Sequence, residues 1–267
     1  MSLSSGIGGI GLGIILSWGW KRALIALAAG AVSALAMAPF NAWPVLFLTF
    51  PVVVWLIDGA GAGRFKGVPA AAMSGFWFGL GYFVPGLYWI GYAFLVDAST
   101  FAWLLPFAVL GLPAYLALFP ALGFALARLI WTGGPSRVLA LAISLTASEW
   151  LRGHILTGFP WNAFGYALAE PLALAQTASL IGLWGMTFLA VAIFASPAVL
   201  IDGNRRGATA GGGNGVGNDL CVPGVDIEEC NCRALRGKVA RGFGADALRG
   251  AGNDDNTRGK FGKAGHA

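Results

Sequence analysis

Charge is nearly absent from the first three quarters of this chain. Residues 1–200 contain only 11 charged side chains, seven Lys or Arg and four Asp or Glu, in a protein of 267 residues. A soluble globular domain carries about a quarter charged residues, so this part is not an ordinary water-surrounded fold. Residues 201–267 hold 18 charged side chains, whereas all 11 Trp and all 5 Tyr lie before residue 186. An apolar core is therefore expected in the first part alone.

Six apolar stretches predict membrane-crossing helices. A bilayer core about 30 Å thick needs roughly 20 apolar residues of helix, and every backbone polar group must pair within the segment. The expected fold is all-α, a polytopic bundle of about six transmembrane helices. The first two stretches are short and joined at 39–41, so they form either two tilted spans or one re-entrant hairpin. The candidates are Ala23–Ala38, Trp43–Ile57, Val68–Phe94, Phe101–Ala127, Val138–Leu151 and Ala173–Leu200.

Cationic residues indicate the orientation of these spans, because short loops rich in Lys and Arg remain in the cytoplasm. In the six-span topology, eight of the Lys and Arg residues up to Arg206 lie on one side of the membrane, and Arg152 alone lies on the other. Both chain ends are therefore expected in the cytoplasm, and loops 97–100 and 152–170 in the opposite, periplasm-like compartment. The cations on the cytoplasmic side are Lys21, Arg22, Arg64, Lys66, Arg128, Arg137, Arg205 and Arg206.

Gly and Pro interrupt the third and fourth stretches. Small residues four apart, such as Gly75 and Gly79, let helix backbones approach closely in lipid. The alternative is that broken helices line a lipid or substrate cavity, since irregular backbone in a membrane needs protein or water around it. A small-molecule or lipid transporter is thus a second candidate function, although no internal repeat supports it. An aromatic cluster fits either a cavity or an interface belt: Phe76, Trp77, Tyr82, Phe83, Tyr88, Trp89 and Tyr92.

The most polar part of the apolar region begins at Glu149. Glu149 and Arg152 are three residues apart, so on a helix they share a face and can form an ion pair. An ionisable residue within a span costs about 2.5–3.5 kcal/mol, and an Arg at a helix end lowers this cost by extending to the interface. We interpret the pair as a structural anchor, with a functional role as the alternative. His154 has no evident partner and is interpreted as structural.

The segment after this helix is predicted to contact lipid. Gly158 and Pro160 favour a turn, and the aromatic side chains of Phe159 and Trp161 are suited to the headgroup layer. We expect Phe159, Pro160 and Trp161, together with Trp89, to form the contact surface.

Several short motifs follow one another in a fixed order over about residues 21–201. They are Ala38-Pro39-Phe40 with Trp43-Pro44, Gly75-Phe76-Trp77-Phe78-Gly79, Gly86-Leu87-Tyr88-Trp89, Glu149-Trp150-Leu151-Arg152-Gly153-His154, Thr157-Gly158-Phe159-Pro160-Trp161-Asn162, Gly165-Tyr166 and Gly182-Leu183-Trp184-Gly185. This series resembles apolipoprotein N-acyltransferase, an enzyme of the bacterial inner membrane that completes lipoprotein maturation. One such motif would be weak evidence, but the ordered set is specific.

The resemblance implies transfer of an acyl chain from a phospholipid to the α-amino group of an N-terminal diacylglyceryl-cysteine. The family's Glu base, oxyanion-stabilising Lys and Cys nucleophile lie in a periplasmic, nitrilase-like domain that follows the membrane helices. The implied partners are phospholipid, diacylglyceryl-lipoprotein and the bilayer, with no cofactor. Nucleic acid is not an expected partner, because the net charge of +5 forms no basic stripe.

The sequence departs from the family after Asp202. We expect a transmembrane domain over 1–201 and a disordered or frameshifted tail over 202–267 in place of the nitrilase-like domain, because the tail shows no helical or strand period. None of the three tail cysteines has the family's nucleophile context, so no catalytic residue is assigned. The chain is expected to be inactive alone, leaving a non-catalytic lipid-binding module. A metal site is disfavoured, because ligand-spaced His and a CxxC pair are absent around Cys221, Cys230 and Cys232.

Overall fold

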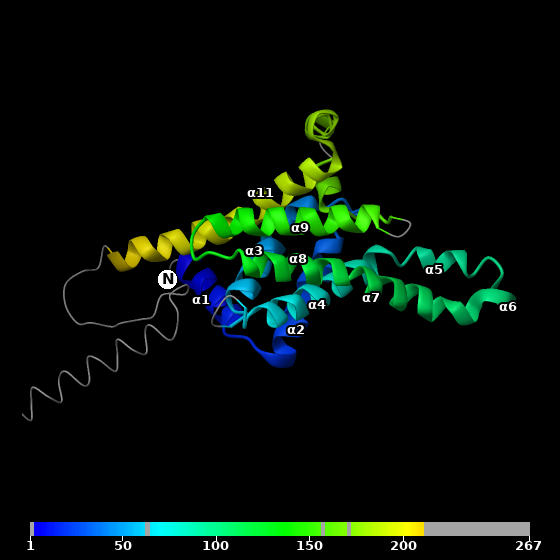
Figure 1. Cartoon of the computed structure of the whole chain (residues 1–267), viewed down its shortest axis with the longest axis horizontal. Coiled ribbons are helices and arrows are strands. Elements are labelled where there is room, and N and C mark those ends of the chain that lie inside the picture. The colour runs from blue at the N-terminus through cyan, green and yellow to red at the C-terminus, as the bar shows by residue number, and fades with distance from the viewer. Residues whose placement is uncertain (1–2, 62–64, 156–157, 170–171, 211–267) are drawn as a thin grey trace, which may run out of the picture. The chain divides into compact units, whose positions relative to one another are not determined.

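The structure is a computed structural model that describes residues 3–61, 65–155, 158–169 and 172–210 (Figure 1). Every regular element in these ranges is a helix, which confirms the all-α prediction. In chain order the elements are α1 (Leu3–Ile15), α2 (Gly19–Ala34), η1 (Trp43–Val45), α3 (Leu46–Asp58), α4 (Val68–Gly86), α5 (Ile90–Ala93), α6 (Ala98–Phe101), η2 (Ala102–Leu104), η3 (Phe107–Gly111), α7 (Leu112–Leu116), α8 (Leu118–Leu129), α9 (Ser136–His154), η4 (Phe164–Leu168), α10 (Leu172–Ala175) and α11 (Ala178–Ala210). The segment η3 is π-helical, and the other η elements are 3-10 helices.

Helices occupy all six predicted stretches, but they differ in length and continuity. Two helical segments of the described chain are long and apolar enough to cross a membrane, Ala98–Leu129 and Ala178–Asp202, and Trp43–Asp58 is a shorter apolar helix. The predicted third span is divided, because α4 ends at Gly86 and α5 begins at Ile90. A crossing by all six stretches therefore remains a prediction.

Close helix contacts depend on glycine. A Cβ atom placed on Gly75 would lie 2.5 Å from the carbonyl oxygen of Pro120, and one on Gly79 would lie 2.9 Å from Cα of Ala117. A Cβ on Gly30 would overlap the backbone of α4 in the same way. These glycines allow α4 to pack directly against α8 and α2. The packing interpretation of Gly75 and Gly79 is thus supported by the structure.

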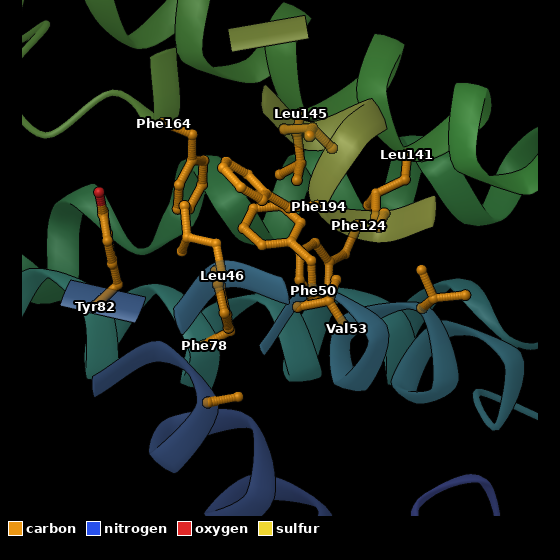
Figure 2. Packing of buried hydrophobic residues seen from close by; sticks show 14 of the residues in the cluster. Leu46, Phe50, Val53, Phe78, Tyr82, Phe124, Leu141, Leu145, Phe164 and Phe194 are labelled. Carbon is orange, nitrogen blue, oxygen red and sulfur yellow. The ribbon is translucent and has the colours of Figure 1, made fainter. Parts of the chain in front are cut away.

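Aromatic rings form the centre of the core, drawn in Figure 2. The ring of Phe164 lies between Phe50 of α3 and Tyr82 of α4, with ring centroids 5.1 and 4.9 Å away. Phe194 of α11 completes this cluster beside Phe50. Phe164 is 2% exposed, so the short helix η4 is held in the core. The segment that precedes η4 is therefore anchored at its C-terminal end.

A partly buried ionic network joins the C-terminal end of α3, the start of α9 and α11. The guanidinium of Arg137 donates through Nη1 to Asp58 Oδ2 at 2.7 Å and through Nη2 to Asp202. The indole Nε1 of Trp131 donates to Asp58 Oδ1 at 2.7 Å. We call these four residues the Arg137 network. Sequence separations of 65 and 79 residues between the ion-pair partners show that it closes the bundle between distant parts of the chain.

A second buried arginine stabilises the end of α3. Arg22 Nη1 donates to the carbonyl oxygen of Gly59 at 2.9 Å, Nη2 donates to that of Leu56, and Nε donates to Ser74 Oγ at 2.8 Å. Carbonyl groups at a helix C-terminus carry partial negative charge, so a cation here is favourable. Arg22 therefore links the start of α2 to α3 and α4 beside the Arg137 network.

The helix α11 continues past the predicted start of the tail at residue 202 and ends at Ala210. Residues 211–267, including Cys221, Cys230 and Cys232, lie outside the described residues. The predicted disorder of the tail and the domain boundary at residue 202 stay predictions.

Candidate functional site

The site forms where the chain turns back over the C-terminal end of α9. The helix ends at His154, and Ile155 adopts an extended conformation. The amide of Phe159 then donates to the carbonyl oxygen of Arg152 at 2.9 Å. Gly158 has a φ of +72°, and a Cβ there would lie 2.5 Å from the carbonyl oxygen of Gly153, so the turn requires glycine. Residues 158–163 are called the return loop below; residues 156 and 157 lie outside the described part.

Arg152 forms hydrogen bonds with the backbone of the return loop. Its Nη1 donates to the carbonyl oxygens of Phe159 and Trp161 at 3.0 and 2.6 Å. The guanidinium also lies over the ring of Phe83, 5.1 Å from the centroid. Arg152 is only 2% exposed, so it does not extend to an interface as the sequence reasoning supposed. Its hydrogen-bond acceptors are backbone carbonyl groups, which lie next to the guanidinium because the chain turns back after α9.

Glu149 provides the counter-charge and joins the site to α11. Its Oε1 lies 3.6 Å from Nη2 of Arg152 and accepts the amide of Phe164 at 3.3 Å. Its Oε2 accepts the hydroxyl of Thr187 at 3.0 Å, and the same hydroxyl oxygen accepts the amide of Gly165 at 3.1 Å. Both carboxylate oxygens are therefore hydrogen-bonded in a site where Glu149 is 5% exposed. Thr187 was not singled out from the sequence, although a hydroxyl within the sixth apolar stretch was a usable signal.

Tyr82 and Asn162 attach the return loop to the end of α4. Asn162 has a φ of 55°, and its carbonyl oxygen accepts the phenol of Tyr82 at 2.9 Å. The Asn162 side-chain Nδ2 donates to the carbonyl oxygen of Gly86 at 3.2 Å. The sequence placed Tyr82 in an aromatic cluster without a role for its hydroxyl. The loop is thus tied to α9 and α4, and η4 anchors its end.

The outer surface of the return loop is aromatic. Trp161 is 56% exposed and its ring lies 5.6 Å from that of Trp89, which is 44% exposed. Phe159 and Pro160 are half-buried. Of the four predicted contact residues, the structure brings Trp89 and Trp161 together as an exposed pair and leaves Phe159 and Pro160 beside it. The aromatic cluster is divided, because Tyr82 and Phe83 are buried in the core.

His154 lies at the edge of this site. Its ring stacks on Trp150 at 4.5 Å, and Nδ1 lies 2.7 Å from the carbonyl oxygen of the same residue. In the described part of the chain, His, Cys, Asp and Glu do not gather in threes that could hold a metal ion. The charges of Glu149 and Arg152 are engaged with each other and with backbone. The arrangement is suited to presenting a fixed aromatic surface to an apolar ligand.

Comparison with known proteins identifies the family of this chain. Residues 29–196 match the sequence model of the apolipoprotein N-acyltransferase N-terminal domain. The chain belongs to this family. The matched segment of the apolipoprotein N-acyltransferase N-terminal domain includes Glu149, Arg152, Thr187 and the whole return loop. The resemblance predicted from the ordered motifs is confirmed.

Individual relatives carry the same name. The chain is 77% identical to the apolipoprotein N-acyltransferase of Rhodopseudomonas palustris over 197 residues, and 77% identical to that of Bradyrhizobium diazoefficiens over 193 residues. It is 53% identical to that of Brucella suis over 195 residues. These matches cover 74%, 72% and 72% of this chain but only 37%, 36% and 37% of the relatives. The chain therefore spans little more than a third of the length of the curated apolipoprotein N-acyltransferases it matches.

Proposed function

We propose that this chain supplies the membrane part of an apolipoprotein N-acyltransferase, which transfers an acyl chain from a phospholipid to the N-terminal diacylglyceryl-cysteine of a lipoprotein. The observation that carries the proposal is the 77% identity to a protein of that name over the segment that builds the return loop. The chain is proposed to contribute the contact residues that the site holds in place, and not the catalytic residues. The phospholipid and the lipoprotein are the proposed partners.

The proposed topology has six crossings of a bacterial inner membrane, with both ends in the cytoplasm. The arrangement of charges along α9 supports it. Arg137 lies at the start of this helix and Arg152 near its end, about 22 Å apart at about 1.5 Å per residue. Arg22 and Asp202 lie with Arg137, whereas the return loop lies with Arg152. The cations of the short loops then gather on one side, as the distribution of Lys and Arg in membrane proteins requires.

The proposed role of the Trp89–Trp161 pair, with Phe159 and Pro160, is contact with lipid or lipoprotein. We expect Trp161→Ala to reduce acyl transfer roughly 30-fold, because removing an aromatic anchor costs about 2 kcal/mol of binding. The assay uses a chimera in which residues 1–202 of this chain replace the equivalent segment of the Rhodopseudomonas palustris relative, so that the ion pair between Arg137 and Asp202 is kept. N-acylation of a lipoprotein substrate is measured in membranes.

Trp20→Ala in the same chimera is the matched control, because Trp20 is also exposed, at 70%, and lies beside the Arg22 end of the bundle. Both variants should insert into membranes in normal amounts. Unchanged turnover for Trp161→Ala, or an equal loss for Trp20→Ala, would count against the proposed contact surface.

We also propose that the 267-residue polypeptide is inactive by itself. No Glu, Lys and Cys set can be assigned in it, and its only cysteines are Cys221, Cys230 and Cys232. Expression of this chain in a bacterial strain depleted of N-acyltransferase should leave lipoproteins with a free α-amino group, measured by mass spectrometry. The chimera described above serves as the active control. Restored N-acylation by the 267-residue chain alone would overturn this proposal.

A further inference from the structure

Residues 87–111, called the arm below, form a hairpin of short helical elements between α4 and α7. Figure 1 shows α5 and α6 in this hairpin, beyond the end of α4. The helix α5 contacts η3, and a Cβ on Gly91 would lie 3.1 Å from Val109 Cγ2. The first limb of the hairpin, residues 87–96, therefore packs against the second limb, residues 98–111. Nine large apolar side chains of the arm are nevertheless exposed by 44–89%: Tyr88, Trp89, Tyr92, Leu95, Val96, Phe101, Trp103, Phe107 and Leu110.

Such a hairpin needs an apolar surrounding. Its first limb contains only the four-residue helix α5, which is too short for stability in water without burial of apolar surface. An exposed apolar surface of this extent marks an interaction site. Asp97 is the single charged residue of the arm, whereas a protein interface normally has a polar rim. The composition therefore favours hydrocarbon over a protein partner.

The backbone of the arm is largely paired within itself. Amide groups of its first limb donate to carbonyl groups three residues earlier, from Ile90 to Leu87 at 3.0 Å through Leu95 to Tyr92 at 3.1 Å. Past the tip, the amides of Thr100 and Phe101 donate to the carbonyl oxygen of Asp97. A lipid environment requires such internal pairing, because it offers no alternative partners.

The second limb is continuous with a segment that is long enough to cross a membrane. Ala98–Leu129 has 32 residues, about 48 Å of helix against a hydrocarbon core of about 30 Å. With Arg128 at one interface, roughly 20 residues of helix reach the other interface near Ala108. At that level lies the π-helix η3, directly after Pro106. The irregular helix and the proline provide a bend where the chain leaves the core.

The tip of the arm is its polar end. Ser99 Oγ donates to Asp97 Oδ1 at 2.7 Å. Hydrogen bonds from the hydroxyl groups of Ser99 and Thr100 lower the pKa of the Asp97 carboxyl below its usual value. The tip therefore carries an ionised group that needs water, while Trp103 and Phe107 lie toward the base.

We propose that the arm lies in the headgroup and upper acyl layer of the leaflet on the return-loop side, with Trp103 and Phe107 in lipid and Asp97 in contact with water. This inference rests on the proposed membrane crossing. The contact between Trp89 and Trp161 then makes the return loop continuous with a lipid-embedded surface. The partner is the bilayer itself.

The test measures depth with single cysteines in the full chain, after Cys221, Cys230 and Cys232 are replaced by serine. Trp103→Cys, Phe107→Cys and Val96→Cys are labelled with a small fluorophore and reconstituted in phosphatidylethanolamine and phosphatidylglycerol vesicles. Leu118→Cys on α8, where Leu118 is 54% exposed, is the reference site. Quenchers are a lipid nitroxide near the headgroup, a lipid nitroxide near the chain end, and aqueous iodide.

We expect labels at positions 103 and 107 to lose most of their fluorescence to the headgroup nitroxide, and the label at 96 to lose most of its fluorescence to iodide. The label at 118 should respond to the chain-end nitroxide. Labels at 103 and 107 that respond only to iodide, or to no quencher because a protein covers them, would overturn the inference while 118 still responds to lipid. A label at 118 that also escapes both lipid nitroxides would instead contradict the membrane crossing.

Discussion

Arg152→Met is expected to lower the free energy of unfolding by about 3–5 kcal/mol, because it leaves the Glu149 carboxylate buried without its counter-charge. Methionine keeps an unbranched apolar side chain in the buried space, so the loss reports on the guanidinium, including its contact with the Phe83 ring, rather than on volume. The carbonyl oxygens of Phe159 and Trp161 also lose their donor, which removes two of the hydrogen bonds that hold the return loop. Equilibrium unfolding in mixed detergent micelles, followed by Trp fluorescence, measures the change.

A double variant separates charge compensation from simple disruption. Glu149→Gln together with Arg152→Met removes both charges, and replacing a buried pair by neutral groups is often close to neutral in stability. We expect the double variant to recover most of the stability lost in Arg152→Met. The coupling energy follows from the double-mutant cycle. A double variant no more stable than Arg152→Met would show that the pair does not act as a unit.

Arg137→Met is expected to be similarly damaging, by about 3–5 kcal/mol, because it leaves two carboxylates close together in the Arg137 network. The side chain of Asp58 is 13% exposed, and that of Asp202 is 28% exposed. Water therefore reaches Asp202 more easily, and repulsion should fall mainly on Asp58. The same unfolding measurement applies.

The network offers its own controls. Adding Asp58→Asn to Arg137→Met should restore much of the lost stability, whereas adding Asp202→Asn should restore less. Lys21→Met is the matched cation control, because Lys21 lies next to Arg22 but is exposed. Equal effects of Lys21→Met and Arg137→Met would contradict the role assigned to the network.

Much of the helical content could be predicted from the sequence, because unbroken apolar runs leave a chain few other ways to satisfy its backbone. The spacing of Glu149 and Arg152 likewise predicted a shared helix face. The sequence indicated that Gly and Pro interrupt the third stretch, but it could not show that Asn162 Nδ2, from 76 residues later in the chain, donates to the Gly86 carbonyl oxygen where α4 ends. Periodicity within a stretch carries no information about such a partner.

The burial of Arg152 could not be predicted for a related reason. Its acceptors are backbone carbonyls of the return loop, and they reach it only because Gly158 adopts a positive φ. Thr187 and the carboxylates around Arg137 also come from distant helices. Local spacing identified the charged groups, whereas tertiary packing decided which groups neutralise them.

The pairing of Asp202 with Arg137 has a practical consequence for altered versions of this protein. A shortened chain that stops before Asp202 would deprive Arg137 of one of its two counter-ions. A reporter protein fused to this bundle should therefore be joined after Asp202, so that the last ion pair forms before the foreign sequence begins. A reporter fused before Asp202 would respond to the loss of the ion pair between Arg137 and Asp202 as well as to the orientation of the chain.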